Sequence, residues 1–167
     1  MPGDLKIRAA APDDYDEIIK LFDSWAPKNW DRNSAVKYYQ KFFHNRQGCI
    51  MDKVFVGIAD GKIVGVTGYC PAKDDPNGIY WLNWFYIHKD LTSHGYGGRL
   101  LDRIIEILKG KDAHKLYVNT SSDLFYGPAR VLYKSRKFRK VDVIKNHYEK
   151  GEDQIVYSRN LAKQCNS

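Results

Sequence analysis

The pattern of apolar and polar positions predicts several β-strands. In residues 4–10, apolar side chains alternate with charged ones, as in a strand with one buried face. Residues 53–71 contain two β-branched runs joined by Asp60-Gly61, a dipeptide that tolerates the positive φ values of a tight hairpin turn. Residues 79–88 are apolar on both faces, which is typical of a central strand. The sequence therefore predicts an opening strand, an antiparallel hairpin and a buried strand, in that order.

Apolar residues at helical spacing predict four helices. The first covers residues 12–25 and begins with a proline followed by acidic residues, which suit the first turn of a helix. The other three cover residues 33–46, 97–109 and 126–138. Gly110 is the expected stop of the third helix, because glycine readily ends a helix.

Three further strands complete the predicted fold, at residues 114–122, 141–148 and 153–161. The resulting order, β-α-α-β-β-β-α-β-α-β-β, predicts a mixed α/β fold with a central, mostly antiparallel sheet flanked by helices. No linker, internal repeat or low-complexity segment divides the chain. A single domain over residues 1–167 is therefore expected.

Composition adds a basic charge to this picture. With 167 residues and 43% hydrophobic content, the chain can build one sizeable core. Its 27 Lys and Arg against 20 Asp and Glu give a net charge of +7, which would attract the phosphates of a nucleotide or a nucleic acid. A solvated basic surface is an equally good interpretation. Many basic residues lie in 129–150 among apolar ones, which suits a folded face better than a basic arm.

The cysteines and the absence of long apolar runs bear on location. Cys49, Cys70 and Cys165 are odd in number and show no close spacing, and no apolar leader opens the chain. No apolar run approaches the roughly 20 residues needed to cross a bilayer. We therefore expect a reduced, cytoplasmic protein without a membrane span, and we expect no metal site.

The main candidate for a binding site is a glycine-rich turn between the buried strand and the third helix. Gly95, Gly97 and Gly98 allow backbone N–H groups to converge and a ligand to approach closely. Together with the helix dipole, those N–H groups would bind an anion, most naturally a phosphate or pyrophosphate, and Arg99 could add a charge-assisted bond. The alternative is a tight connection without a ligand. The dinucleotide fingerprint is absent, since it needs glycine where Leu100 stands, and the Gly-Lys-Ser/Thr ending of the mononucleotide loop is absent too.

Three segments carry a resemblance to a known family. WFYIHKDLTSHGYGGRLL resembles the cofactor-binding motif of the GNAT superfamily of N-acetyltransferases, in which a strand runs into Gln/Arg-x-x-Gly-x-Gly/Ala and a helix. NTSSDLFYGPARVLYKSRKF resembles the strand and helix that follow, and HYEKGEDQIVYSRNL is similar to the C-terminal strand pair of many small members. Three positions depart from the family pattern. Thr92 replaces Gln/Arg, Lys89 replaces a frequent proline, and Lys137 stands where a glycine is usual.

The resemblance implies acetyl-CoA as the cofactor, with its pyrophosphate on the glycine-rich turn and its pantetheine arm bonded to the backbone of strand 79–88. Tyr133 matches the tyrosine that in many members protonates the leaving CoA thiolate, and a phenol with a pKa of about 10 is suited to that role. A helix-packing role is the alternative for Tyr133. The residues implied in cofactor binding are Tyr86, Ile87, His88, Thr92, Ser93, His94, Gly95, Tyr96, Gly97, Gly98, Arg99, Asn119, Tyr126 and Ala129.

The acceptor would be a primary amine, whose pocket must remove water from the ammonium and take up its proton. Strand 79–88 has no acidic residue to act as general base, so the base must be another group, a water relay or the bulk solvent. Histidine has suitable chemistry, but His94 lies in the phosphate-binding turn and His88 suits a cap of the strand, so a structural role is favoured for both. Aromatic faces attract a cationic amine. The candidate pocket residues, each of which also suits a core, are Phe22, Trp25, Trp30, Tyr69, Asn83, Trp84 and Tyr148.

These observations favour an acetyl-CoA-dependent N-acetyltransferase that acts on an amine of a small molecule or a peptide. A catalytically weak acyl-CoA-binding sensor is the first alternative, because the strand acid and the usual Gln/Arg are missing. A nucleic-acid-binding domain is the second, although several phosphates of a cofactor account for part of the same charge. Members of the family often dimerise through C-terminal strands, so the resemblance also allows a homodimer. The identity of the amine is open.

Overall fold

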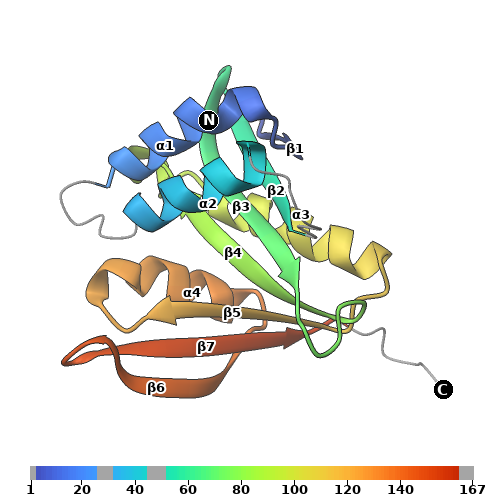
Figure 1. Ribbon diagram of the computed structural model, residues 1–167, viewed down its shortest axis with the longest axis vertical. Helices are drawn as coiled ribbons and strands as arrows, with labels where there is room; N and C mark the ends of the chain where they lie inside the picture. The colour runs from blue at the N-terminus through green and yellow to red at the C-terminus, as the bar shows by residue number, and fades with distance from the viewer. Residues whose placement is uncertain (1–2, 26–31, 45–51, 162–167) are drawn as a thin grey trace. The chain divides into compact units, whose positions relative to one another are not determined.

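The computed structural model describes residues 3–25, 32–44 and 52–161 (Figure 1). These residues fall into two compact units, and the chain passes between them three times. The first unit comprises Met1–Cys70 and Asn83–Ile104, and the second comprises Pro71–Leu82 and Ile105–Ser167. The single domain expected from the sequence stays a prediction.

The order of helices and strands is the one that the sequence predicts. Short 3-10 turns at Pro12–Asp14, Lys89–Leu91 and Leu124–Tyr126 accompany the regular elements. Those elements are β1 (Lys6–Ala9), α1 (Tyr15–Asp23), α2 (Arg32–His44), β2 (Lys53–Ala59), β3 (Lys62–Pro71), β4 (Ile79–Ile87), α3 (Tyr96–Gly110), β5 (Lys115–Ser121), α4 (Gly127–Ser135), β6 (Arg139–Glu149) and β7 (Glu152–Asn160).

The seven strands have the order β1-β2-β3-β4-β5-β7-β6. The pairs β1–β2, β2–β3, β5–β7 and β6–β7 are antiparallel, and the pair β4–β5 is parallel. The expectation of a mixed, mostly antiparallel sheet with β4 at its centre is therefore confirmed. A strand whose two faces are both covered needs apolar side chains on both, which is the pattern of β4.

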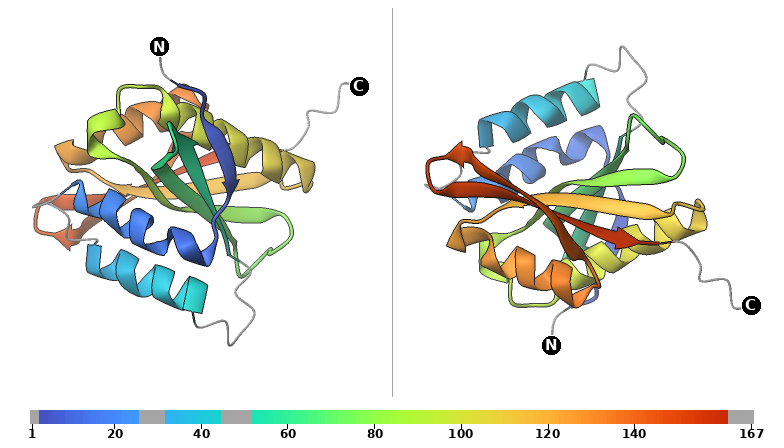
Figure 2. Two further views of the ribbon diagram at one scale, coloured as in Figure 1. Left: turned by 90° about the horizontal axis from the view of Figure 1, so that it is seen from above. Right: turned by 90° about the horizontal axis from the view of Figure 1, so that it is seen from below.

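In the first unit, helices cover both faces of the strands (Figure 2, left). On one face, buried residues of α1 and α2, such as Phe22 and Tyr39, pack with Val54, Val56 and Val66. On the other face, Tyr96 and Leu100 of α3 pack with Val64 and Ile87. Successive side chains of a strand point to opposite faces, so Trp84 and Tyr86 join the first cluster while Phe85 and Ile87 join the second.

The hairpin of β2 and β3 forms as the sequence predicts. Asp60 and Gly61 have φ values of 50° and 74°, which are the two positive values that the favoured two-residue hairpin turn requires. Lys62 pairs with Ala59 on the far side of the turn. Local turn chemistry alone therefore explains why this part of the chain folds back on itself.

In the second unit, β5 is bonded along its whole length to β7, from Lys115 opposite Asn160 to Ser121 opposite Gln154. The pairing of β5 with β4 is shorter and runs from Ile79–Trp81 to Lys115–Tyr117. The rings of Trp81 and Tyr117 stack there at 4.9 Å. Tyr133 of α4 lies 5.9 Å, ring to ring, from Tyr157 of β7, so α4 packs on the strands of its own unit.

Two helices end in the same type of turn, with a residue other than glycine in the left-handed conformation. At the end of α4, Lys137 has a φ of 67°, and the N–H of Phe138 donates to the carbonyl of Tyr133 at 3.0 Å. At the end of α3, Asp112 has a φ of 59°. Gly110 is the last residue of α3, as expected, but the left-handed residue that turns the chain lies two positions later.

The structure contains no candidate for a membrane span within its described helices, since none is both long enough and apolar enough to cross a bilayer.

Candidate functional site

The glycine-rich turn occupies the position that the sequence predicts for it, between β4 and α3 in the first unit. Gly95 has a φ of 78°, whereas Gly97 and Gly98 lie in the first turn of α3 with ordinary helical backbone. No atom lies within 4 Å of the place where a Cβ of Gly95 would stand. Glycine is therefore required at position 95 by its backbone angle and not by lack of space.

The beginning of α3 provides the donors of an anion site. The N–H of Arg99 bonds to the carbonyl of Gly95 at 3.3 Å and closes the first helical turn. The N–H groups of Tyr96, Gly97 and Gly98 have no partner within the helix and point out of its N-terminal end. The dipole of a 15-residue helix adds positive potential there. The Arg99 guanidinium lies 3.5 Å from the carbonyl of Leu5 on the exposed side of the helix. Backbone N–H groups are thus the main donors of this turn.

The three residues before Gly95 form the outer part of the turn. Thr92, Ser93 and His94 are exposed. The hydroxyl of Thr92 donates to the carbonyl of Lys89 at 3.3 Å, and the ring of His94 stacks on that of Tyr96 at 5.7 Å. Thr92, which replaces the Gln/Arg of the family motif, therefore stabilises the preceding 3-10 turn.

The end of β4 has two of its backbone groups already bonded within the first unit. The N–H of His88 donates to the carbonyl of Val64 at 2.8 Å, so the backbone groups of His88 point toward β3. Backbone groups alternate along a strand, so the N–H and carbonyl of Ile87 face the opposite edge. There the indole Nε1–H of Trp25 donates to the Ile87 carbonyl at 3.0 Å. Trp25, expected in the acceptor pocket, thus holds the strand that was expected to bind the cofactor.

Trp84 interrupts the regular backbone of β4, which the sequence did not reveal. Its φ is 51°, a left-handed value that bulky side chains rarely adopt and that costs about 1–3 kcal/mol. Rings of both neighbouring helices hold the side chain in place, with centroid distances of 5.9 Å to Phe22 and 5.7 Å to Tyr38. Strained backbone of this kind is concentrated at functional sites in proteins.

Next to Trp84 lies a polar cluster that sequence reasoning missed, except for Asn83. The Tyr38 hydroxyl donates to Oδ2 of Asp52 at 2.9 Å, and the side chain of Asn83 lies near Tyr38 and Cys70, where it opposes the rise in the pKa of both groups. Burial is the main cause that raises the pKa of the Tyr38 phenol and of the Cys70 thiol. Helix periodicity could not single out Tyr38, and Asp52 precedes its strand without any motif.

The other acceptor candidates are not brought together. Phe22 is fully buried in the core of the first unit. Tyr69 pairs with Lys53 and stacks on Phe55 at 6.0 Å, which places it on the sheet face opposite to Val54 and Trp84. Tyr148 belongs to β6 in the second unit, where its hydroxyl accepts a bond from Nε2 of Gln154 at 3.4 Å. Trp30 lies outside the described residues.

In the second unit, the predicted cofactor residues surround the junction between β5 and α4. Asn119 is exposed on β5, Tyr126 ends the 3-10 turn, and Ala129 lies in the first turn of α4. Arg130 fixes this junction, because its guanidinium donates to the carbonyls of Ser121 and Asp123 at 2.5 Å and 2.8 Å. A single arginine therefore sets the direction in which α4 leaves β5.

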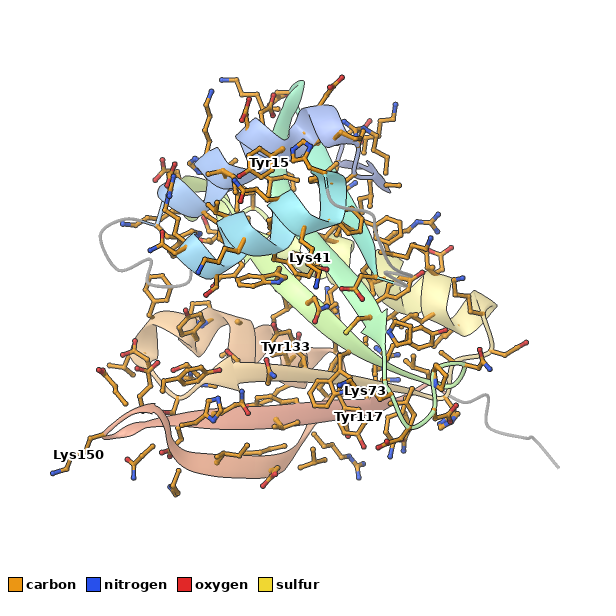
Figure 3. All side chains as sticks on the ribbon, in the orientation of Figure 1. Tyr15, Lys41, Lys73, Tyr117, Tyr133 and Lys150 are labelled. Atoms are coloured by element: carbon orange, nitrogen blue, oxygen red, sulfur yellow. The ribbon has the colours of Figure 1, made fainter. Side chains whose placement is uncertain are left out.

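Tyr133 is buried between α4 and the strands of its unit (Figure 3). Its ring lies 5.8 Å from Phe138 and 5.9 Å from Tyr157. Burial, with a smaller contribution from Tyr157, raises the pKa of Tyr133 above its usual value. The phenol is therefore fully protonated at neutral pH, as a proton donor must be before it acts.

Comparison with known families shows which family the chain belongs to. A model of the Acetyltransferase (GNAT) family matches residues 15–135, which is more than half of the chain. The chain belongs to the GNAT family. The matched region includes the glycine-rich turn, α3 and Tyr133, so the enzyme class inferred from the sequence, an acetyltransferase, is confirmed at the level of the family.

GNAT proteins are also found among similar sequences and structures. The N-alpha-acetyltransferase of Saccharolobus solfataricus is 26% identical over 167 residues, covering 95% of this chain and 94% of the relative. A crystal structure described as a GNAT-family acetyltransferase from Desulfovibrio desulfuricans matches with a TM-score of 0.84 at 20% identity, over 95% of this chain and 100% of that one. An aminoglycoside 6'-N-acetyltransferase complexed with coenzyme A matches with a TM-score of 0.75 at 12% identity, over 95% and 98% of the two chains. The GNAT fold is confirmed, and one of these similar structures contains coenzyme A, the carrier part of the cofactor expected from the sequence.

Proposed function

We propose that the protein transfers the acetyl group of acetyl-CoA to a primary amine of a small molecule or a peptide. The observation that carries this proposal is the junction of β4 and α3, where Gly95 at a φ of 78° turns the chain into the N-terminus of a 15-residue helix. Such a terminus binds the pyrophosphate of a nucleotide cofactor with backbone N–H groups and its dipole.

For the pyrophosphate, we assign the N–H groups from Gly95 to Gly98, with the exposed residues Thr92, Ser93 and His94 beside them. Arg99 is exposed and its side chain is long enough to add a charge-assisted bond. These assignments do not depend on the identity of residue 92, since backbone groups provide most of the bonds.

For the pantetheine arm, the N–H of Ile87 is the strongest candidate among the groups of β4. The N–H of His88 is bonded to Val64, and the carbonyl of Ile87 is bonded to Trp25. An amide of the cofactor that uses the Ile87 carbonyl must therefore displace the Trp25 indole. Tyr86 and His88 contribute as neighbours in the strand, while Asn119, Tyr126 and Ala129 stay proposed cofactor residues of the second unit.

Chemistry proceeds by direct attack, in which the unprotonated amine nitrogen bonds to the thioester carbon and the carbon–sulfur bond breaks. Acetyl-CoA supplies the activated acyl group. Tyr133 donates its phenol proton to the departing thiolate, and the nitrogen loses its extra proton to solvent or a base, so the products are an amide and the free thiol. Because burial keeps the pKa of Tyr133 high, the proton is present throughout the physiological pH range.

Release of free thiol from acetyl-CoA, measured against a panel of amines, tests the function. Tyr133→Phe should lower kcat by roughly 10²- to 10⁴-fold, the usual contribution of general acid–base catalysis, without changing the affinity for acetyl-CoA. Tyr15→Phe, which removes a hydroxyl from α1 of the first unit, is the matched control and should leave kcat unchanged.

Two results would support the alternatives. Tight binding of acetyl-CoA without turnover of any amine, together with no effect of Tyr133→Phe, would favour the acyl-CoA sensor. Binding to DNA or RNA that weakens steeply with salt would favour the nucleic-acid-binding domain. The cytoplasmic location and the homodimer stay predictions. The exposed residues Val141 and Ile144 on the edge strand β6 support pairing between copies.

A further inference from the structure

The polar cluster beside Trp84 contains a carboxylate, that of Asp52, for which the described part of the chain provides no cation. Asp52 is half-buried and directly precedes β2, whose first residue, Lys53, pairs with Tyr69. Within residues 3–25, 32–44 and 52–161, no Lys, Arg or His lies within ion-pair distance of it. Carboxylates that lose part of their water are usually paired, so this one is suited to a positively charged ligand.

The hydrogen bonds among the described residues leave acceptor positions of the Asp52 carboxylate open. An ionised carboxylate offers about four acceptor positions, and the Tyr38 hydroxyl uses one of them at Oδ2, at 2.9 Å. Burial and the Asp52 charge both raise the pKa of Tyr38, so the phenol remains a donor and holds the carboxylate in one orientation. The oxygen Oδ1 is then the atom that can accept from a ligand.

Tyr38, which binds this carboxylate, lies among other aromatic rings. The ring of Tyr38 lies 5.7 Å from that of Trp84 and stacks with Phe42 at 6.4 Å. Faces of tyrosine and tryptophan attract ammonium and guanidinium groups. Asn83 adds a side-chain amide to the cluster. The hydroxyl of Thr67 holds the backbone at this position by donating to the main-chain carbonyl of Asn83 at 3.2 Å. Carboxylate, rings and amide together make a recognition site for an organic cation.

We propose that Asp52, oriented by Tyr38, whose ring lies next to that of Trp84, binds a positively charged group of the acceptor other than the nitrogen that is acetylated. The reacting nitrogen must give up its proton before it attacks, whereas a second cationic group keeps its charge throughout the reaction and so can stay bound to an ionised carboxylate. The inference rests on the proposed acetyltransferase function. The acceptor is then a diamine, or a peptide that carries a basic side chain close to its free amino group.

Two pairs of probes test this inference by binding, without any need for acetyl transfer. Cadaverine and pentylamine share a five-carbon chain, and only cadaverine has a second ammonium group. The peptides Ala-Lys-Ala-Ala and Ala-norleucine-Ala-Ala differ in the same way. In at least one pair, calorimetric titration should show that the member with the extra cation binds roughly tenfold more tightly, a preference appropriate to a partly exposed charged hydrogen bond.

The variants locate that preference. Asp52→Asn removes the charge at nearly constant shape and should abolish the preference, while Asp52→Glu should retain it. Asp52→Ser provides the same test as Asp52→Asn if the amide disturbs the bond to Tyr38. Asp60→Asn makes the same chemical change in the β2–β3 turn, where asparagine also adopts a positive φ, and should have no effect. The affinity for acetyl-CoA should be the same in all four variants.

Two outcomes would overturn the inference. One is the absence of a preference for the cation in both pairs, and the other is a preference that persists in Asp52→Asn. Either result leaves the thiol-release assay unaffected, so failure of this inference is distinguishable from failure of the proposed function.

Discussion

The left-handed lysine at the end of α4 leads to a prediction about stability. Lys137 has a φ of 67°, and the bonds from the N–H groups of Lys137 and Phe138 to the carbonyls of Lys134 and Tyr133 close the turn around it. A residue with a Cβ costs about 1–2 kcal/mol in this conformation, whereas glycine adopts it freely. Lys137→Gly should therefore stabilise the fold.

The size of the gain follows from two opposing terms. Relief of the left-handed strain contributes about 1–2 kcal/mol, and the greater freedom of glycine in the unfolded chain takes back about 0.5–1 kcal/mol. A net gain of about 1 kcal/mol corresponds to a rise in Tm of about 2–4 °C for a protein of this size. The Lys137 side chain is exposed, so its removal should cost little packing.

Scanning calorimetry of three variants separates strain from charge. Lys137→Gly should melt above the wild-type protein, and Lys137→Asn should fall between them, because asparagine tolerates this conformation better than most residues. Lys137→Ala removes the same charge but keeps the Cβ, so it should bring no gain. If Lys137→Ala raised Tm as much as Lys137→Gly, the gain would come from charge, and the argument from backbone strain would be wrong.

Two further predictions concern single contacts of the first unit. Trp25→Phe removes the indole N–H that donates to the Ile87 carbonyl, a bond of about 1 kcal/mol net. A cofactor that uses this carbonyl should then bind up to about tenfold more tightly in calorimetric titration. Weaker binding would contradict the idea that the Trp25 indole and the cofactor compete for the Ile87 carbonyl. Asp14 accepts bonds from Arg8 at 2.7 Å and 2.9 Å, which hold the pKa of this carboxyl below its usual value. The resulting stabilisation is present above the ordinary aspartate pKa of about 3.9 and is lost as the pH falls through the lowered value. Urea unfolding of Asp14→Asn should therefore show a free energy of unfolding lower by roughly 1 kcal/mol at pH 7, a modest figure because Arg8 is partly exposed. The decrease should be smaller at pH 2. Equal decreases at the two pH values would refute the role of the Asp14 charge.

The order of elements was predictable because it depends on local patterns. The alternation along β1 and the Asp60-Gly61 turn depend only on residues close in sequence, and the structure contains both features. The left-handed turns after α3 and α4 were harder to predict from the sequence. A lysine or an aspartate does not by itself predict a positive φ. At Lys137, the indication came from the family pattern, in which a glycine is usual at this position.

The details of the site were less predictable, because they depend on contacts between distant residues. The bond from Trp25 to Ile87 joins residues 62 positions apart, and periodicity shows only that both side chains are apolar. The bond from Tyr38 to Asp52 likewise needs α2 to be placed over the sheet before it can be seen. Strain at Trp84 is also a product of packing, since rings from α1 and α2 hold that side chain where its own backbone preference would not.

The difference between Gly95 and Gly97 explains which part of the glycine motif evolution can vary. Gly95 is fixed by its φ of 78°, which no alanine adopts cheaply, whereas Gly97 lies in ordinary helical backbone at the start of α3. Alanine is a better helix former than glycine, so natural selection can replace the second glycine without breaking the turn. This accounts in physical terms for a family motif that reads Gly-x-Gly/Ala, with the first position invariant in type and the second open to either residue. Divergent relatives of this chain should accordingly be recognised by the first glycine and not by the glycine content of the loop.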